Sequence, residues 1–289
     1  LTDIKLDPGK MYFLIKKEFA ELVKKHPSID NLISFDKKLG IKELFRLGKF
    51  LRNNDYDVIF DIHSVFRTRV LSLFLRRNLF KQIRKPRMRR FMLFYAHQNY
   101  FEKSFSHIKM YHTLLDEDKT FPPTNLFIDS GEDKETKVFL NKNNIGENYI
   151  AIVPGAAWSQ KQWSIENYNK LMRRLIDSFK SKIVILGSTN DIICDQIIKD
   201  DNIINLKDKT SLRMAMGIVK HAKHTLGSDT GLLHISEAMG TPVTMILGPT
   251  SQETGARVTL HDSKVIENKD LWCRPCSQNG SRPCYRKEQ

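Results

Sequence analysis

Apolar runs and amphipathic segments alternate along the chain, and this alternation limits the fold more than any other feature. Short apolar runs typical of buried strands stand at 11–15, 32–35, 58–62, 149–153, 183–186, 203–204 and 243–247. Segments with apolar residues at helical spacing lie between them at 18–25, 41–51, 165–179, 192–198 and 212–219, and a further one ends at 75. Such alternation is typical of parallel sheets covered by helices. The sequence therefore predicts an α/β fold.

The pattern weakens at residues 118–148, which contain Pro122-Pro123, a predicted turn at 131–133, a short helix and the polar stretch 141–146. A chain of 289 residues is long enough to form two hydrophobic cores. We therefore predict an N-terminal domain at 1–130 and a C-terminal domain at 146–289, with a cleft between them. Ligands of such sheets bind at the carboxyl ends of the strands.

The composition restricts the partners. The formal net charge is +14, which favours phosphates, acidic glycans or an anionic membrane surface. No apolar run approaches the ~20 residues of a membrane span, and no segment near the start has the pattern of a signal peptide. We expect a cytoplasmic protein.

The stretch from Arg76 to Lys109 is crowded with Arg and Lys, and aromatic residues are interspersed among them. A solvated helical face gives the same pattern. An anion-binding face and contact with a membrane surface are the functional interpretations. Nucleic acid fits the charge, but no nucleic-acid-binding motif is present, so none is expected to bind.

The stretch Gly-Ser-Asp-Thr-Gly-Leu-Leu-His at 227–234 follows a short strand and opens a helix that runs to Gly240. Asp229 or Thr230 can cap that helix, and Gly231 permits close approach of a ligand to the backbone. A helix N-terminus attracts phosphate. An ordinary strand-to-helix turn has the same sequence pattern, so this stretch needs support from others.

Three further loops supply that support. The first, 154–163, contains small residues and Lys161, the second is Gly-Ser-Thr-Asn-Asp at 187–191, and the third is 209–211. Each alone is also typical of a surface loop or a helix cap. Because all four loops follow consecutive strands of one predicted sheet, they are expected to meet at one edge, where a nucleotide diphosphate would lie.

Together these motifs resemble a known family. Pro-Gly-Ala-x-Trp-x-x-Lys-x-Trp at 154–163, a strand that ends in Gly-Ser, Ser-Asp-Thr-Gly-Leu-Leu-His, Gly-Thr-Pro-Val at 240–243 and Leu-Gly-Pro-Thr at 247–250 are similar to the family 9 glycosyltransferases. These are the ADP-heptose:lipopolysaccharide heptosyltransferases of the Gram-negative inner core. Asp61-Ile62-His63 with Arg67 resembles the family's Asp-Leu-His-Gly-x-x-Arg element. The resemblance covers nearly the whole chain.

The resemblance implies a GT-B fold of two Rossmann-like domains and an inverting transfer that needs no metal. It also implies a nucleotide sugar bound by the C-terminal domain, with Lys161 stabilising the leaving group. The donor-binding residues expected on this basis are Ser159, Lys161, Gly187, Ser188, Asn190, Asp191, Thr210, Asp229, Thr230, Gly231, Leu232 and His234. The acceptor-binding residues expected are His63, Arg67, Arg69, Lys85, Arg87, Arg89 and Arg90.

Two parts of the family pattern are not matched. In the family, a Gly-Asp loop after the first strand carries the general base. Too few residues separate Asp3 from the strand that starts near Lys10 for a helix to fit between them. We therefore do not assign Asp3 as the base and expect that Asp upstream of residue 1. The closing helix of GT-B enzymes is expected beyond Gln289.

Cys273, Cys276 and Cys284 form a Cys-x-x-Cys pattern with a third cysteine, which has metal-ligand or redox character. A fourth ligand is not evident, so a structural loop with free thiols is preferred to a zinc or disulfide clip. No cofactor is expected.

The function expected is transfer of heptose from ADP-heptose to a lipopolysaccharide core acceptor by an enzyme peripheral to the inner membrane. The sequence leaves two alternatives. One is a family member that moves another nucleotide sugar, and the other is a basic nucleic-acid-binding or membrane-surface protein on a degenerate nucleotide fold.

Overall fold

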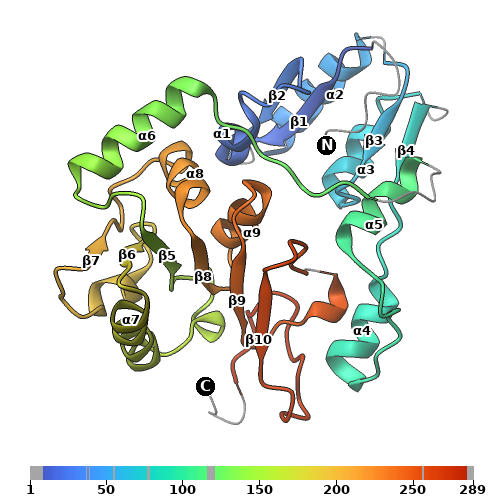
Figure 1. The fold of residues 1–289 in the computed structure, drawn as a ribbon. Coiled ribbons are helices and arrows are strands. Elements are labelled where there is room, and N and C mark those ends of the chain that lie inside the picture. Colours follow the sequence, from blue (N-terminus) through green and yellow to red (C-terminus); the bar gives the residue numbers. More distant parts are fainter. Residues whose placement is uncertain are drawn as a thin grey trace.

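A six-stranded, entirely parallel sheet forms the centre of the C-terminal half of the molecule (Figure 1). The structure is a computed structural model that describes residues 9–36, 38, 40–54, 56–76, 79–115, 121–255 and 257–284. The strands lie in the order β10-β9-β8-β5-β6-β7. Their bounds are β5 Tyr149–Val153, β6 Lys182–Ile185, β7 Ile203–Asn205, β8 His224–Ser228, β9 Val243–Leu247 and β10 Lys264–Glu267.

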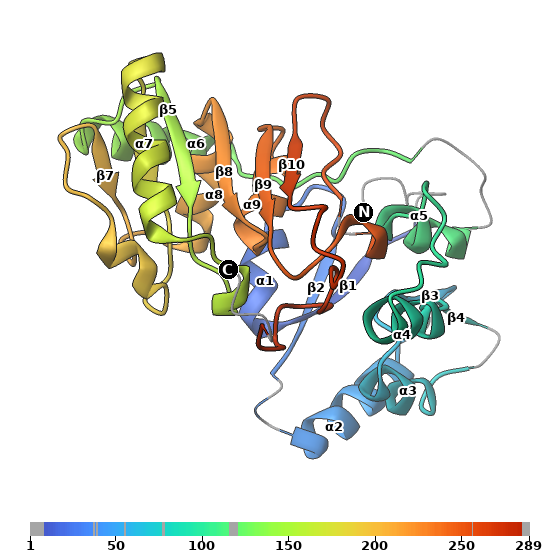
Figure 2. The ribbon, with the colours of Figure 1, turned by 90° about the horizontal axis from the view of Figure 1, so that it is seen from below.

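Helices cover both faces of this sheet, which is why its central strands are almost continuously apolar. Figure 2 shows α7 in front of the strands and α6 and α8 behind them. The helices of this half are α6 Ser130–Lys142, α7 Ile165–Phe179, α8 Leu212–His221 and α9 Gly231–Ala238, with 3₁₀ turns η5 Ser159–Lys161, η6 Ile192–Gln196 and η7 Gln252–Thr254.

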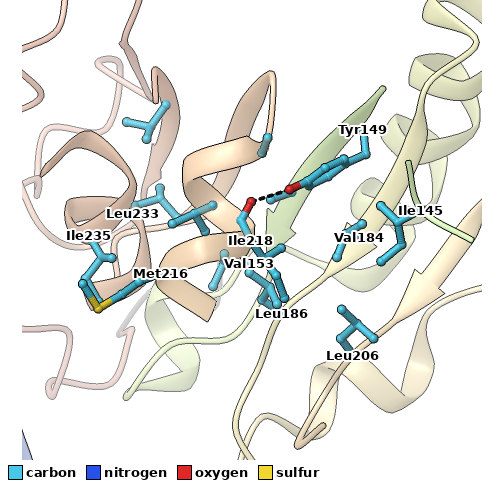
Figure 3. Packing of buried hydrophobic residues seen from close by; sticks show 14 of the residues in the cluster. Ile145, Tyr149, Val153, Val184, Leu186, Leu206, Met216, Ile218, Leu233 and Ile235 are labelled. Atoms are coloured by element: carbon cyan, nitrogen blue, oxygen red, sulfur yellow. Dashed lines mark hydrogen bonds between the residues drawn. The ribbon is translucent and has the colours of Figure 1, made fainter. Parts of the chain in front are cut away.

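Each face of the sheet has its own hydrophobic core. The larger core joins the strands to α6, α8 and α9 and includes Met216 and Leu233 (Figure 3). Within it the hydroxyl of Tyr149 donates a 2.6 Å hydrogen bond to the carbonyl of Ile218, which ties β5 to α8. The second core lies under α7, where Tyr168 and Met172 are fully buried.

The N-terminal half contains two smaller parallel sheets. β1 Tyr12–Lys16 pairs with β2 Asn31–Phe35, and β3 Ile59–Asp61 pairs with β4 Phe80–Gln82. The helical elements of this half are η1 Lys17–Phe19, α1 Ala20–Val23, α2 Gly40–Arg52, α3 Phe66–Ser72, α4 Arg87–Ala96, α5 His107–His112 and η4 Thr113–Leu115. No helix among the described residues is both long enough and apolar enough to span a bilayer.

Several contacts join the two halves, and three of them lie at separate places. Arg213 of α8 donates to the carbonyl of Glu21 in α1 at 3.2 Å. The N–H of His107 donates to the carbonyl of Gly255 at 3.1 Å. Arg282 donates to the carbonyl of Phe94 in α4 at 3.3 Å. The N-terminal half therefore contacts the C-terminal half at several separate points.

Most elements agree with the sequence prediction, including the bounds of β5, α7 and β9. The predicted turn at 131–133 is wrong, because these residues form the first turn of α6. Asp129 and Glu132 make a reciprocal capping box there. The segment 192–198 was predicted to be a helix, but the structure has only the 3₁₀ turn η6 at Ile192–Gln196. The short strands β4 and β10 were not predicted. The predicted domain limits, 130 and 146, stay predictions. Helix α6 lies between these two limits in the sequence, and it packs on α8 of the C-terminal half.

Gly227 sets the distance between β8 and β5, and this gives a test of the sheet next to the motif 227–234. A Cβ atom at Gly227 would collide with the backbone carbonyl of Val153, whereas a Cβ at Gly231 would meet nothing within 4 Å. We expect Gly227→Ala to lower the free energy of unfolding by about 2 kcal/mol, because backbone must move. Gly231→Ala is the matched control and should leave stability unchanged or slightly higher. Urea denaturation of both variants is the measurement, and equal stabilities would contradict the assignment.

Candidate active site

Four loops line the carboxyl edge of the six-stranded sheet in the order set by β8, β5, β6 and β7. Two contacts show that neighbouring loops touch. A Cβ at Gly155 would collide with the carboxylate of Asp191, so the loops after β5 and β6 are closely packed. The hydroxyl of Thr189 donates to Asp208 at 2.6 Å, which joins the loops after β6 and β7.

Lys161 and Asp229 form an ion pair at the centre of this edge, with 2.7 Å between Nζ and Oδ2. Both side chains are only 13% exposed. Thr250 donates to the same carboxylate oxygen at 3.0 Å, and Nε2 of His234 lies 3.5 Å from the other one. The structure thus brings together three predicted donor-site residues and adds Thr250, which belongs to the motif 247–250 but had no predicted role.

The surroundings of Asp229 keep its carboxylate ionised. Burial raises its pKa, but the hydrogen bond with His234 and the charge of Lys161 outweigh that effect and hold the pKa well below its usual range. A carboxylate with so low a pKa is a poor proton acceptor near neutral pH. The geometry therefore suits Asp229 for binding and orientation.

The first turn of α9 is free of side-chain caps. Thr230 is its N-cap residue and makes no side-chain capping hydrogen bond. Asp229 or Thr230 was expected to cap this helix, and this is wrong for both: Thr230 makes no capping hydrogen bond, and the carboxylate of Asp229 binds Lys161 and Thr250. Among the described residues, the first turn of α9 therefore has no side-chain N-cap hydrogen bond, and it begins two residues after Asp229, which pairs with Lys161.

Two of the side chains in the loop 187–191 that were predicted to bind the donor make hydrogen bonds within the loop. Asp191 accepts from both the backbone N–H and the hydroxyl of Ser188, at 2.6 and 2.7 Å. These two side chains stabilise their own turn, whereas Asn190 is exposed. Thr210 directly precedes Ser211, which caps α8, and Ser159 is exposed at the start of η5. Gly187 packs against Cys194 and Asp191.

The C-terminal tail encloses the ion pair from one side. Arg274 donates to the carbonyls of Gly248 and Thr250, at 2.6 and 3.0 Å, and pairs with Glu267 at 3.2 Å. A Cβ at Gly280 would lie 2.5 Å from Cγ of Lys161, so the tail covers the stem of that lysine. Arg274 was not predicted, since its partners lie far from it in sequence.

The three cysteines of the tail are free thiols. Burial raises the pKa of the Cys276 thiol, and Cys273 and Cys284 nearby raise it further. Within the described part of the chain, no group of three or more His, Cys, Asp or Glu residues is placed to share a metal ion. The expectation of a cofactor-free enzyme stays a prediction.

Asp61 organises the turn that carries His63. Its carboxylate is buried and accepts from the backbone N–H groups of His63 and Ser64, both at 2.9 Å, and from Gln82 at 2.5 Å. Burial raises the pKa of Asp61, but these hydrogen bonds outweigh it and lower the pKa overall. The Asp-Ile-His element therefore positions His63 and the start of α3.

Lys85 and Arg90, together with His107 beside Arg90, form what we call the cationic cluster of the N-terminal half. Nη2 of Arg90 lies 3.3 Å from Nε2 of His107, and Nε of Arg90 is buried without a hydrogen-bond partner in the structure. Burial lowers the pKa of Lys85, and the charges of Arg90 and Arg87 lower it further.

His107 connects the cluster to the donor side. Burial lowers its pKa, followed by the charges of Arg90 and His234. The backbone N–H of His107 donates to the carbonyl of Gly255, so the two halves are in contact here. His107 lies in the basic stretch 76–109 but follows no strand, so no sequence signal distinguished it.

The other predicted acceptor residues are more dispersed. Arg87 donates to the carbonyl of Ser64 at 3.1 Å, and the charge of Arg67 acts on His63. Arg89 is exposed and lies 3.9 Å from Glu102, and Arg69 is exposed on α3. The structure thus separates the partly buried cationic cluster from what we call the exposed basic rim, which consists of Arg69, Arg87 and Arg89. Asp3 and Gln289 both lie outside the described residues.

Comparison with solved structures defines the class of this fold. The glycosyl transferase family 9 structure from Veillonella parvula superimposes with a TM-score of 0.74 at 18% identity, over 90% of this chain and 78% of that one. The E. coli ADP-heptose lps heptosyltransferase II superimposes with a TM-score of 0.69 at 22% identity, over 91% and 82%. The fold is therefore of the GT-B type, as the sequence predicted.

Sequence comparison gives the family. The model of glycosyltransferase family 9 (heptosyltransferase) matches residues 44–285. The lipopolysaccharide core heptosyltransferase OpsX of Haemophilus influenzae is 23% identical over 251 residues, which cover 81% of this chain and 69% of that protein. This chain belongs to glycosyltransferase family 9 and is a transferase.

The low pKa of Asp229 predicts how the ion pair affects stability. An acid whose folded-state pKa is depressed stabilises the fold above its unfolded pKa, near 3.8, and loses that contribution as the pH falls below it. Asp229→Asn leaves Lys161 buried and unpaired, which should cost about 3 kcal/mol between pH 5 and 8. The difference from wild type should narrow below about pH 4. Urea denaturation across this range measures it, and a gap that stays constant down to pH 2.5 would refute the pairing.

Proposed function

We propose that this chain transfers heptose from ADP-heptose to a lipopolysaccharide core acceptor, with inversion and without a metal. The observation that carries the proposal is the buried Lys161–Asp229 pair beside the uncapped start of α9. Leaving diphosphate carries developing negative charge, which many glycosyltransferases offset with a metal ion. Here Lys161 and the helix N-terminus supply positive charge at that position.

The ion pair leaves Lys161 able to bind a ligand. An ammonium group has three N–H donors, of which Asp229 uses one. Its two remaining donors are available to phosphate oxygens, while the two carboxylate oxygens of Asp229 are near His234 and Thr250. Asp229 can accept from the sugar hydroxyls of the donor, and Gly231 and Leu232 can present backbone N–H groups to the diphosphate.

The loops after β6 and β7 are proposed to hold the nucleoside. Ser188 and Asp191 bind each other, so among the predicted residues of these loops the side chains available to the nucleoside are those of Asn190 and Thr210. Asn190 would bind the ribose and Thr210 the adenine. The general base is proposed to be the family's Asp, expected upstream of residue 1.

The cationic cluster and the exposed basic rim are proposed to bind the acceptor. Partly buried cations without counter-charges favour an anionic ligand, because the ligand restores the interactions that they lost on desolvation. Phosphate or carboxylate groups of a lipopolysaccharide core fit this requirement. The exposed rim would act at longer range, on the anionic inner leaflet of the inner membrane, in a salt-dependent way.

The donor assignment is tested by titrating ADP and ADP-heptose calorimetrically and by measuring transfer to a lipopolysaccharide core acceptor. Lys161→Ala should lower kcat by about 100-fold and weaken ADP binding by about tenfold, because the leaving diphosphate loses its cation. Lys170→Ala, an exposed lysine on α7, is the matched control. Wild type that binds neither ligand would overturn the proposal, and preference for GDP- or UDP-sugars would indicate another donor.

The acceptor assignment has a separate test. Arg90→Gln should raise the KM for the acceptor by about tenfold and leave the KM for ADP-heptose unchanged, because one charge-assisted contact is lost. Arg46→Ala, an exposed arginine on α2 that pairs with Glu43, serves as control. Equal changes in both KM values would contradict a role specific to the acceptor.

A further inference from the structure

Arg282 connects the part of the C-terminal tail that covers Lys161 to the helix that carries the cationic cluster. Its Nη1 donates to the carbonyl of Phe94 in α4 at 3.3 Å. Two residues earlier, a Cβ at Gly280 would lie 2.5 Å from Cγ of Lys161. Arg90 of the cationic cluster precedes Phe94 by about one turn of α4. The guanidinium of Arg282 is therefore placed at the junction of the donor side and the acceptor side.

The guanidinium group of Arg282 is held in one orientation. Its central carbon lies 4.0 Å from the centre of the Tyr95 ring, and Nη1 donates to the carbonyl of Cys276 at 3.4 Å as well as to that of Phe94. Stacking on an aromatic ring is a favourable arrangement for arginine. Phe94 lies in the last turn of α4, where the helix dipole favours a cation. A side chain that is already ordered loses little entropy when a ligand binds.

Only one of the three guanidinium nitrogens of Arg282 is engaged. Among the described residues, Nε and Nη2 make no hydrogen bond and no carboxylate pairs with the side chain. Arg274, in the same tail, uses all three nitrogens on backbone carbonyls and on Glu267. Arg282 is partly exposed, and neither Nε nor Nη2 is among the buried polar atoms that lack a partner. The edge formed by Nε and Nη2 is therefore open to a ligand.

This edge selects an anion. Nε and Nη2 present two parallel N–H donors, and two oxygens of one phosphate or carboxylate group accept from such an edge. From these observations we infer that Arg282 is an anion-binding residue that holds a phosphate or carboxylate group of a substrate at the junction of the two halves. The inference rests on the proposed function, which supplies two sources of that group: the diphosphate of the donor and the acidic groups of the acceptor.

Chemical modification of wild type tests the site without altering the fold. Phenylglyoxal reacts with accessible arginines, and peptide mass spectrometry measures the rate at each one. Arg282 should react in the free protein, whereas Arg274 should not, because its nitrogens are all engaged. A ligand present at about ten times its Kd should slow the modification of Arg282 about tenfold. Protection by ADP identifies the donor as the source of the anion, and protection by a lipopolysaccharide core acceptor identifies the acceptor.

The control for this measurement is Arg173, which is exposed on α7 and should react at the same rate with and without ligand. An Arg282 that does not react in the free protein would overturn the inference. So would an Arg282 that reacts at the same rate in the presence of either ligand.

Substitution gives a second measurement. Arg282→Gln should raise the KM of the substrate that carries the anion by about tenfold and leave the other KM unchanged, because a charge-assisted hydrogen bond is lost. Arg282→Lys keeps the charge but lacks the two-donor edge, so it should recover only part of the loss. Arg173→Gln is the matched control. Wild-type KM values for both substrates in Arg282→Gln would contradict the inference.

The two proposals fail in different ways. If wild type neither binds ADP nor transfers heptose, but inorganic phosphate protects Arg282, the proposed function is wrong and the anion site remains. If wild type transfers heptose and neither ligand protects Arg282, the anion site is wrong and the proposed function stands.

Discussion

The ion pair between Lys161 and Asp229 is the interaction on which the arrangement of the site depends. It joins the loop after β5 to the turn after β8, and these strands are neighbours in the sheet. Moving two charges out of water is expensive, and the attraction between them offsets the cost only when the geometry is good. The surrounding contacts provide that geometry: Gly227 permits the close approach of β8 to β5, and Gly280 permits the tail to cover the lysine stem.

The two halves of the molecule treat charge differently. On the donor side, Lys161 and Arg274 each pair with a carboxylate, Asp229 and Glu267 respectively. Near the cationic cluster, the carboxylate of Asp61 acts on Lys85, but it already accepts hydrogen bonds from Gln82 and from backbone N–H groups. Burial lowers the pKa values of Lys85 and Arg90, which means that it disfavours their charged forms. A bound anion would stabilise those charged forms. A net charge of +14 indicates only that the partner is anionic. The partial burial of Lys85 and Arg90 indicates where on the molecule an anionic group would bind most favourably.

Residues whose role is local were predictable, and residues whose role depends on distant contacts were not. α7 was assigned correctly because Ser164 caps an amphipathic segment with a clear helical period. β10 was missed because it is an edge strand with alternating exposure and only two apolar residues. At 131–133, Gly131 suggested a turn, but the capping box between Asp129 and Glu132 starts a helix and determines the local structure.

The site followed the same rule. Lys161 and Asp229 could be placed together because consecutive parallel strands end at one edge. Thr250, Arg274 and His107 could not, since their contacts come from packing between segments that are far apart in sequence.

The bridge between His107 and Gly255 shows how the two halves could recognise one acceptor. Gly255 has φ of +93°, and a Cβ there would lie 2.9 Å from the backbone nitrogen of His107, so the close contact requires glycine. The side chain of His107 lies beside Arg90 of the cationic cluster, while Gly255 ends η7 in the C-terminal half. The backbone contact thus fixes where the cluster lies relative to the C-terminal half. Specificity for an acceptor would then come from the spacing between the cluster and the donor side, which a charged surface alone does not provide.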